Sequence, residues 1–236
     1  MRSSALSARD RLIVGLDLPS PAEAEKMVAT LGGAVSFYKI GMQLTFSGGL
    51  GLAKDLVKAG KNVFLDMKLL DIPNTVSHAV EAIADMGVTF TTIHAYPQAM
   101  RAAVAGRGDS SLKLLGVTVL TSLDDDDLHE TGYATKVGSL VLKRAGHAAE
   151  IGMDGLICSP MEVTAIRAAT GEALALVTPG IRPAGAETGD QKRAATPESA
   201  IRDGADYLVV ARPVIQAPDP RAAAEAIIAK IDSTAK

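Results

Sequence analysis

Short apolar runs alternate with longer amphipathic segments along the whole chain. Runs of five to ten residues, rich in aliphatic side chains and bounded by Gly, Pro or Asp, lie at 11–17, 36–40, 62–68, 88–94, 112–121, 154–158, 173–178 and 206–211. Continuous apolar runs of this length are typical of strands buried on both faces. Between the runs, apolar residues three and four positions apart predict helices, for example over 20–31, 74–87, 136–152 and 220–231.

Residues that start and stop helices support this alternation. Pro21 and Pro73 stand where two of the predicted helices begin, and glycines that suit helix ends precede predicted strands at 60, 87, 152 and 204. Eight strand–helix units in 236 residues match a closed barrel. We therefore predict an α/β fold, a single (β/α)8 TIM barrel over residues 1–236, with residues 1–10 as a tail or short helix. An open, doubly wound sheet is the alternative.

Composition and charge narrow the class of protein. Lys and Arg number 24 and Asp and Glu 27, so the net charge is −3, and no basic run suggests a nucleic-acid partner. The one cysteine, Cys158, cannot form an internal disulfide, which favours a reducing compartment. We find no signal-peptide pattern and no stretch of 18 apolar residues. The sequence therefore predicts a soluble cytoplasmic protein with no membrane partner.

Charged residues collect at the ends of the first three predicted strands. The segment 66–71 reads DMKLLD, and strand alternation places Asp66 and Lys68 on one side, about 7 Å apart by strand rise. Lys39 and Asp17 end the two preceding strands, which neighbour the third in a barrel. Since catalytic groups project from the carboxyl ends of barrel strands, we expect these side chains and Asp71 to form one charge network.

A lattice of structural salt bridges is the alternative explanation for this network. Burying several charges is costly, however, and the cost is usually tolerated at functional sites. A lysine between carboxylates stays protonated, which makes it a poor Schiff-base nucleophile and a good proton donor to a developing carbanion. The pattern therefore predicts proton donation to carbon with loss of a carboxylate.

The loops after the seventh and eighth predicted strands suggest a phosphate site. The first contains the segment 178–183, TPGIRP, and continues through several glycines to Gln191, while Arg212 follows the eighth strand. Such loops commonly bind phosphate in barrels, and an arginine can donate two hydrogen bonds to its oxygens. The stretch 182–191 is long enough to form a lid over a ligand. We find no dinucleotide, P-loop or close metal-ligand motif.

These motifs resemble those of the orotidine 5′-phosphate decarboxylase family of the bacterial type. The match runs from GLD at Gly15 through YKIG, FLDMKLLDIPNT, TIHA, GVTVLTS, LVTPGIRP and GDQKR to ARPV at Ala211. The resemblance implies a homodimeric carboxy-lyase that converts orotidine 5′-phosphate to UMP in pyrimidine biosynthesis. It also implies that no metal and no organic cofactor takes part.

The resemblance assigns catalytic roles to the charge network. Lys68 would donate the proton to C6 of the pyrimidine, and Asp66 would lie against the departing carboxylate. Asp71 would reach into the partner subunit's site and complete a network with Lys39, Asp66 and Lys68. Ile72 would give the partner's site an apolar contact near the carboxylate.

The resemblance also assigns residues to the ribose and the base. Asp17 and Lys39 would hold ribose hydroxyls, together with Thr75 of the partner subunit. Thr121 would recognise the pyrimidine edge, and Pro179 would line the base pocket.

The phosphate residues include one departure from the family pattern. Arg182, Gln191 and Arg212 would bind the phosphate. The family usually has glycine before the arginine of strand 8, and this chain has Ala211. A backbone amide can still reach a phosphate there. The added methyl group leaves less room for the phosphate, so the affinity for phosphate is the property that this departure would change.

Two other functions compete with this interpretation. One is a magnesium-dependent sugar-phosphate decarboxylase or aldolase of the same barrel group, such as a 3-keto-gulonate-phosphate decarboxylase or a hexulose-phosphate synthase. The other is a catalytically silent dimer that binds nucleotides. Chelator sensitivity distinguishes the first from the family reaction, and release of CO₂ distinguishes the second.

Overall fold

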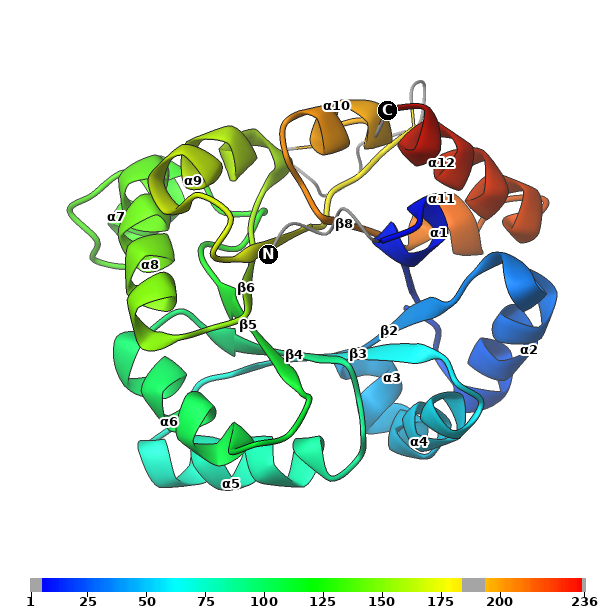
Figure 1. Cartoon of the computed structure of the whole chain (residues 1–236), viewed down its shortest axis with the longest axis horizontal. Coiled ribbons are helices and arrows are strands. Elements are labelled where there is room, and N and C mark those ends of the chain that lie inside the picture. The colour runs from blue at the N-terminus through cyan, green and yellow to red at the C-terminus, as the bar shows by residue number, and fades with distance from the viewer. Residues whose placement is uncertain (1–5, 184–193, 235–236) are drawn as a thin grey trace.

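Eight parallel strands close into a barrel in chain order (Figure 1). The computed structural model describes residues 6–183 and 194–234. The strands are β1 Leu12–Gly15, β2 Phe37–Gly41, β3 Asn62–Leu69, β4 Phe90–His94, β5 Lys113–Val117, β6 Gly155–Ile157, β7 Ala175–Thr178 and β8 Tyr207–Val210. Each lies within or overlaps one of the eight predicted runs. The predicted (β/α)8 barrel is confirmed, and the open sheet is wrong because β1 pairs with β8, for example Leu12 with Leu208.

Helices surround the barrel as an outer ring (Figure 1). The α-helices are α1 Ala8–Arg11, α2 Pro21–Leu31, α3 Met42–Leu44, α4 Leu50–Lys58, α5 Pro73–Ala84, α6 Pro97–Arg107, α7 Asp125–Glu130, α8 Val137–Ile151, α9 Val163–Thr170, α10 Pro197–Arg202, α11 Arg212–Ile215 and α12 Pro220–Thr234. Short turns of other helix types are η1 Gly32–Ala34, η2 Thr45–Gly49 and η3 Pro160–Glu162. Proline occupies the first turn of α2, α5 and α6, where its missing N–H costs nothing.

Two apolar cores separate the inside of the barrel from the layer under the helices. The larger core packs the outward faces of the strands against the helices. The smaller core fills the barrel with Ile13, Val177 and an aromatic group that includes Phe37, Phe90 and Tyr207. The Phe37 and Phe90 ring centroids are 5.0 Å apart, and burial raises the pKa of Tyr207 to about 12. The interior of the barrel is therefore packed with side chains. Cavities lie at both of its ends, and the candidate site lies at the carboxyl end.

Two acidic residues fasten neighbouring strands at the amino end of the barrel. Asp206, just before β8, accepts a hydrogen bond from the backbone N–H of Leu176 on β7 and pairs with Arg167 of α9, both at 2.8 Å. Asp154, just before β6, accepts one from the backbone N–H of Leu114 on β5 and pairs with an arginine of α6. These ion pairs and hydrogen bonds lie away from the carboxyl ends of the strands and stabilise the barrel.

Candidate active site

A cavity of about 480 Å³ opens at the carboxyl ends of the strands. Its walls come from most of the barrel: Asp17 follows β1, Lys39 lies on β2, Asp66 and Lys68 on β3, and Arg212 after β8. Apolar residues of the inner core, such as Phe64 and Val209, form its floor. A concave pocket in which apolar walls and convergent charged groups meet is typical of a small-molecule site.

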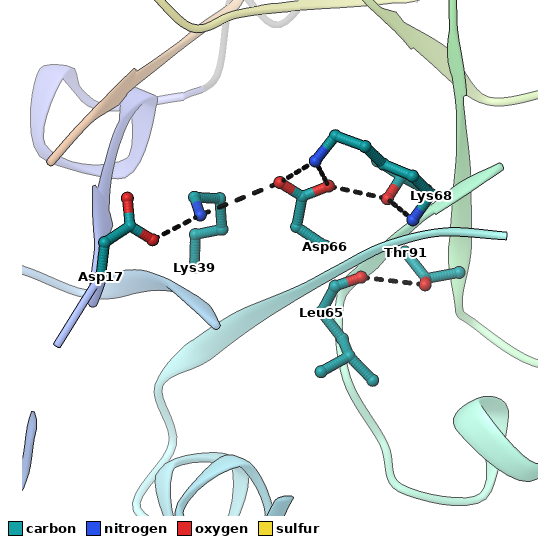
Figure 2. Close-up of polar contacts among 7 residues, drawn as sticks. Asp17, Lys39, Leu65, Asp66, Lys68 and Thr91 are labelled. Carbon is teal, nitrogen blue, oxygen red and sulfur yellow. Dashed lines mark hydrogen bonds and ion pairs between the residues drawn. The ribbon is translucent and has the colours of Figure 1, made fainter. Parts of the chain in front are cut away.

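Four charged side chains form a continuous row in this cavity (Figure 2). Lys39 Nζ lies 2.9 Å from Asp17 Oδ1 and 3.8 Å from Asp66 Oδ2. Lys68 Nζ donates to both carboxylate oxygens of Asp66, each at 2.8 Å. The side chains of Lys39 and Asp66 are only 11% and 12% exposed, and that of Lys68 is 24% exposed. Positive and negative groups therefore alternate, and each buried charge has an opposite neighbour.

The row keeps the Asp66 carboxylate ionised. Burial by itself would raise the pKa of Asp66, but the charges of Lys39 and Lys68 and hydrogen bonds from Lys68 and Thr92 outweigh it and hold that pKa below the ordinary value. The arrangement therefore places the Lys68 amine, a group able to donate a proton, beside an ionised carboxylate.

A bulge in β3 brings Asp66 and Lys68 together. Leu65 pairs with Thr91 of β4 and Leu69 with Ile93, so β3 advances four residues while β4 advances two. Lys68 lies in this bulge with a φ of 50°, in the left-handed region. Among the described residues, every other residue with a positive φ is a glycine. Simple strand alternation therefore does not describe this segment, although both predicted side chains do line the cavity.

Other predicted residues line the opposite side of the cavity. Thr121 follows β5, Pro179 and Arg182 follow β7, and Ala211 and Arg212 follow β8. Arg182 and Arg212 thus follow β7 and β8, which are not neighbours of β3, the strand that carries Asp66. Gln191 and most of the predicted lid lie outside the described residues. Gln216, at the end of α11, also lines the cavity and was not predicted, because no strand end or motif marks it.

Three predicted residues lie apart from this cavity. Asp71 and Ile72, between β3 and α5, and Thr75, in the first turn of α5, do not line it and are exposed. The Asp71 carboxylate accepts a hydrogen bond from the backbone N–H of Ile72 at 2.7 Å. Ile72 is 66% exposed, as is unusual for a large apolar side chain.

Gly15 leaves space for the methyl group of Ala211, the residue that stands where the family usually has glycine. A Cβ atom added at Gly15 would lie 3.0 Å from the Cβ of Ala211 and 3.2 Å from Cε of Lys39. The methyl group of Ala211 therefore fills space that residue 15 leaves empty. Ala211 and Lys39 both line the cavity.

His94 closes β4 beside the charge row and is half-buried. Burial, together with the positive charges of Arg144 and Lys68, lowers the pKa of His94. The neutral imidazole is therefore its favoured form near pH 7.

A cluster of metal ligands and a membrane-spanning helix are both absent from the described residues. Within residues 6–183 and 194–234, no group of three or more His, Cys, Asp or Glu residues is arranged to hold a metal ion. Over the same residues, no helix has the length and apolar character needed to cross a membrane.

Comparison with known proteins identifies the family. Residues 10–227 match the family model described as "Orotidine 5'-phosphate decarboxylase / HUMPS family". A curated protein of Afipia carboxidovorans named orotidine 5′-phosphate decarboxylase is 56% identical over 231 residues, 98% of each chain.

Solved structures agree with this match. The crystal structure of orotidine 5′-phosphate decarboxylase from Lactobacillus acidophilus aligns with a TM-score of 0.82 at 40% identity, covering 94% of this chain and 98% of that one. An uncharacterized conserved protein from Geobacillus kaustophilus aligns with a TM-score of 0.81 at 32% identity, covering 93% and 99%. The chain therefore belongs to the orotidine 5′-phosphate decarboxylase / HUMPS family of (β/α)8 barrels.

Proposed function

We propose that this protein is a cytoplasmic homodimer that decarboxylates orotidine 5′-phosphate to UMP without a metal or organic cofactor. The observation that carries the proposal is the ammonium group of Lys68, held 2.8 Å from both oxygens of Asp66 at the mouth of the cavity. The 56% identity to a protein named for this reaction supports the choice of substrate.

The charge row suits a reaction that forms a carbanion. The bond between C6 and the carboxylate breaks, CO₂ leaves, and the electron pair remains on C6. Lys68 stabilises that charge electrostatically and transfers a proton from Nζ to C6, after which solvent reprotonates the amine. Asp66, ionised beside the departing carboxylate, disfavours the bound substrate more than the neutral CO₂.

The opposite side of the cavity suits the phosphate. Arg182 and Arg212 would bind its oxygens, and we assign Gln191 to the same group although it lies outside the described residues. Asp17 and Lys39 would hold the ribose hydroxyls, and Thr121 and Pro179 would contact the base. Binding energy from these remote contacts holds the carboxylate beside Asp66.

The exposed segment after β3 supports a two-chain site. We assign Asp71, Ile72 and Thr75 to the partner's cavity, where Asp71 would complete the charge row and Ile72 would lie near the carboxylate. Leu70, in the same segment as Ile72, is 51% exposed, and Phe46 of η2 is 84% exposed. Large apolar side chains exposed in this way favour a protein partner.

One assay tests the reaction and its competitors together. The absorbance of orotidine 5′-phosphate is followed as it converts to UMP, with and without EDTA. We expect equal rates in both. Loss of activity with EDTA would indicate the magnesium-dependent members of the barrel group instead. Tight UMP binding with no loss of absorbance and no CO₂ would indicate a silent nucleotide-binding protein.

A further inference from the structure

Thr92 of β4 lies opposite the bulge in β3, where the strands fall out of simple register. Its side chain is fully buried, and its hydroxyl touches both the carboxylate of Asp66 and the backbone of Lys68. We propose that Thr92 is a positioning residue, whose hydroxyl holds Asp66 and Lys68 in the arrangement that the reaction needs. The proposal rests on the proposed function, because it gives Thr92 a role through those two residues.

The direction of each hydrogen bond follows from the groups involved. The backbone N–H of Lys68 can only donate, so Thr92 Oγ1 accepts that bond, at 2.9 Å. The hydroxyl then donates its single proton to Asp66 Oδ1, at 2.8 Å. Lys68 Nζ donates to the same oxygen, which closes a ring through the lysine backbone, the hydroxyl and the carboxylate. The ring favours the ionised carboxylate, because the hydroxyl donates to it.

The ring also holds an unfavourable backbone conformation. A lysine at a φ of 50° is strained and persists only where its surroundings determine it. The backbone N–H of Lys68 has its hydrogen bond to the Thr92 hydroxyl in place of a strand partner. Without the hydroxyl this buried N–H loses that acceptor, and the bulge is free to relax toward an ordinary strand. Nζ of Lys68 would then move relative to Asp66.

The neighbouring threonine supplies a matched control. Thr91 is also fully buried on β4, but it belongs to the opposite face, and its hydroxyl donates to the carbonyl oxygen of Leu65 at 2.9 Å. Figure 2 shows this bond apart from the charge row. Replacing Thr91 with valine removes one buried hydrogen bond between the same two strands and leaves the ring intact.

The experiment compares Thr92→Val, Thr92→Ser and Thr91→Val with the wild-type chain. Decarboxylation of orotidine 5′-phosphate gives kcat and KM, thermal unfolding gives stability, and the carboxyl ¹³C signal of Asp66 gives its pKa without any substrate. The groups that face Asp66 are Lys39 from β2, Lys68 from β3 and His94 from β4, with Asp17 beyond Lys39; all of them are unchanged in every variant.

We expect Thr92→Val to lower kcat at least about tenfold, since small misplacements near the chemistry cost up to about 100-fold, with KM changed less than about threefold. The pKa of Asp66 rises, because a donor to its charged form is lost. Thr92→Ser keeps the hydroxyl and restores both values. Thr91→Val lowers stability without changing either.

Several results would overturn the inference. One is a Thr92→Val enzyme with kcat within twofold of wild type and an unchanged Asp66 titration. Another is an equal loss of kcat in Thr91→Val, which would reduce Thr92 to a structural role. If the wild-type chain itself fails to decarboxylate, the proposed function is wrong, and the Asp66 titration of the three variants alone decides whether Thr92 positions the carboxylate.

Discussion

At the scale of the residue, Lys68 combines a strained backbone conformation with an ammonium group that is paired with Asp66. Its left-handed conformation costs of the order of 1–3 kcal/mol, and its Nζ touches both oxygens of a buried carboxylate. Glycine would be unstrained at this position, so the ion pair with Asp66 offsets the cost of a lysine there. The role proposed for Lys68 in the reaction gives a reason for a lysine at a position that suits glycine.

Lys68→Ala tests that chemistry directly. A positioned general acid contributes about 10²–10⁴-fold, so we expect kcat to fall at least about 100-fold while UMP binding stays measurable by calorimetry. Lys58→Ala, on the exposed surface of α4, is the control and keeps full turnover. Near-normal decarboxylation by Lys68→Ala would remove the lysine from the mechanism.

Asp66 predicts a pH dependence of stability with a definite sign. Because the pKa of Asp66 is lower in the folded chain than in the unfolded one, its ionised form stabilises the fold above the unfolded pKa, near 3.8. That contribution is lost as the pH falls through the folded pKa. We therefore expect the difference in unfolding free energy between wild type and Asp66→Asn to shrink from pH 6 to pH 3, as measured by urea denaturation. A difference that is constant over this range would contradict the lowered pKa.

At the scale of the element, close packing against α6 fixes the position of α5, the helix that follows the exposed segment after β3. A Cβ atom added at Gly106 of α6 would overlap the backbone carbonyl oxygen of Ser77 in α5. Helix α5 begins at Pro73 and carries Thr75 in its first turn. A shift of α5 would therefore displace the residues assigned to the partner's site.

Two glycine substitutions separate packing from helix propensity. Gly106→Ala is expected to destabilise the protein by about 1–3 kcal/mol, because the backbones must move apart. Gly146→Ala in α8, where no atom lies within 4 Å of the added Cβ, is expected to stabilise it by about 0.5–1 kcal/mol. Urea denaturation of both variants measures the two effects, and a change of the same sign in both would contradict the packing argument.

At the scale of the whole molecule, the two ends of the barrel have different tasks. The amino end carries the Asp206–Arg167 and Asp154–Arg107 ion pairs, which link strands to helices. The carboxyl end carries the charge row and the cavity. The exposed segment at 70–75 belongs to the carboxyl end as well, so a partner bound there lies close to the chemistry.

Mixing of two inactive variants tests the shared site. If Asp71 acts in the partner's cavity, a heterodimer of Lys68→Ala with Asp71→Ala contains one intact site, and random exchange restores about a quarter of the wild-type activity. Lys68→Ala mixed with Asp66→Ala restores none, because both residues belong to the same chain's cavity. Failure of the first mixture to regain activity, with heterodimers verified by mass spectrometry, would place Asp71 outside the site.

Ile72 tests the dimer itself. Ile72→Asp is expected to shift the protein from dimer to monomer in analytical ultracentrifugation and to lower its activity, because a charge would be buried in the interface. Met161→Asp is the control, since Met161 is a similarly exposed apolar residue that follows β6. It is expected to change neither the mass nor the turnover. A dimeric Ile72→Asp protein would show that the interface lies elsewhere.

Local pattern alone determined the barrel and the end at which its chemistry lies. The eight apolar runs specify strands, and parallel strands in a barrel bring their carboxyl ends to one face, so Asp17, Lys39, Asp66 and Lys68 had to meet there. The reaction itself was inferred from the resemblance of the motifs around these residues to those of a known enzyme family.

Only the tertiary structure decided how the charges touch. The bulge in β3 depends on its pairing with β4, and a two-residue period contains no information about such an insertion. Thr91 and Thr92 are identical in type and adjacent in sequence, yet one bonds a strand carbonyl and the other the central carboxylate. Which of the two faces the cavity follows from register, and register is set by contacts between segments distant in the chain.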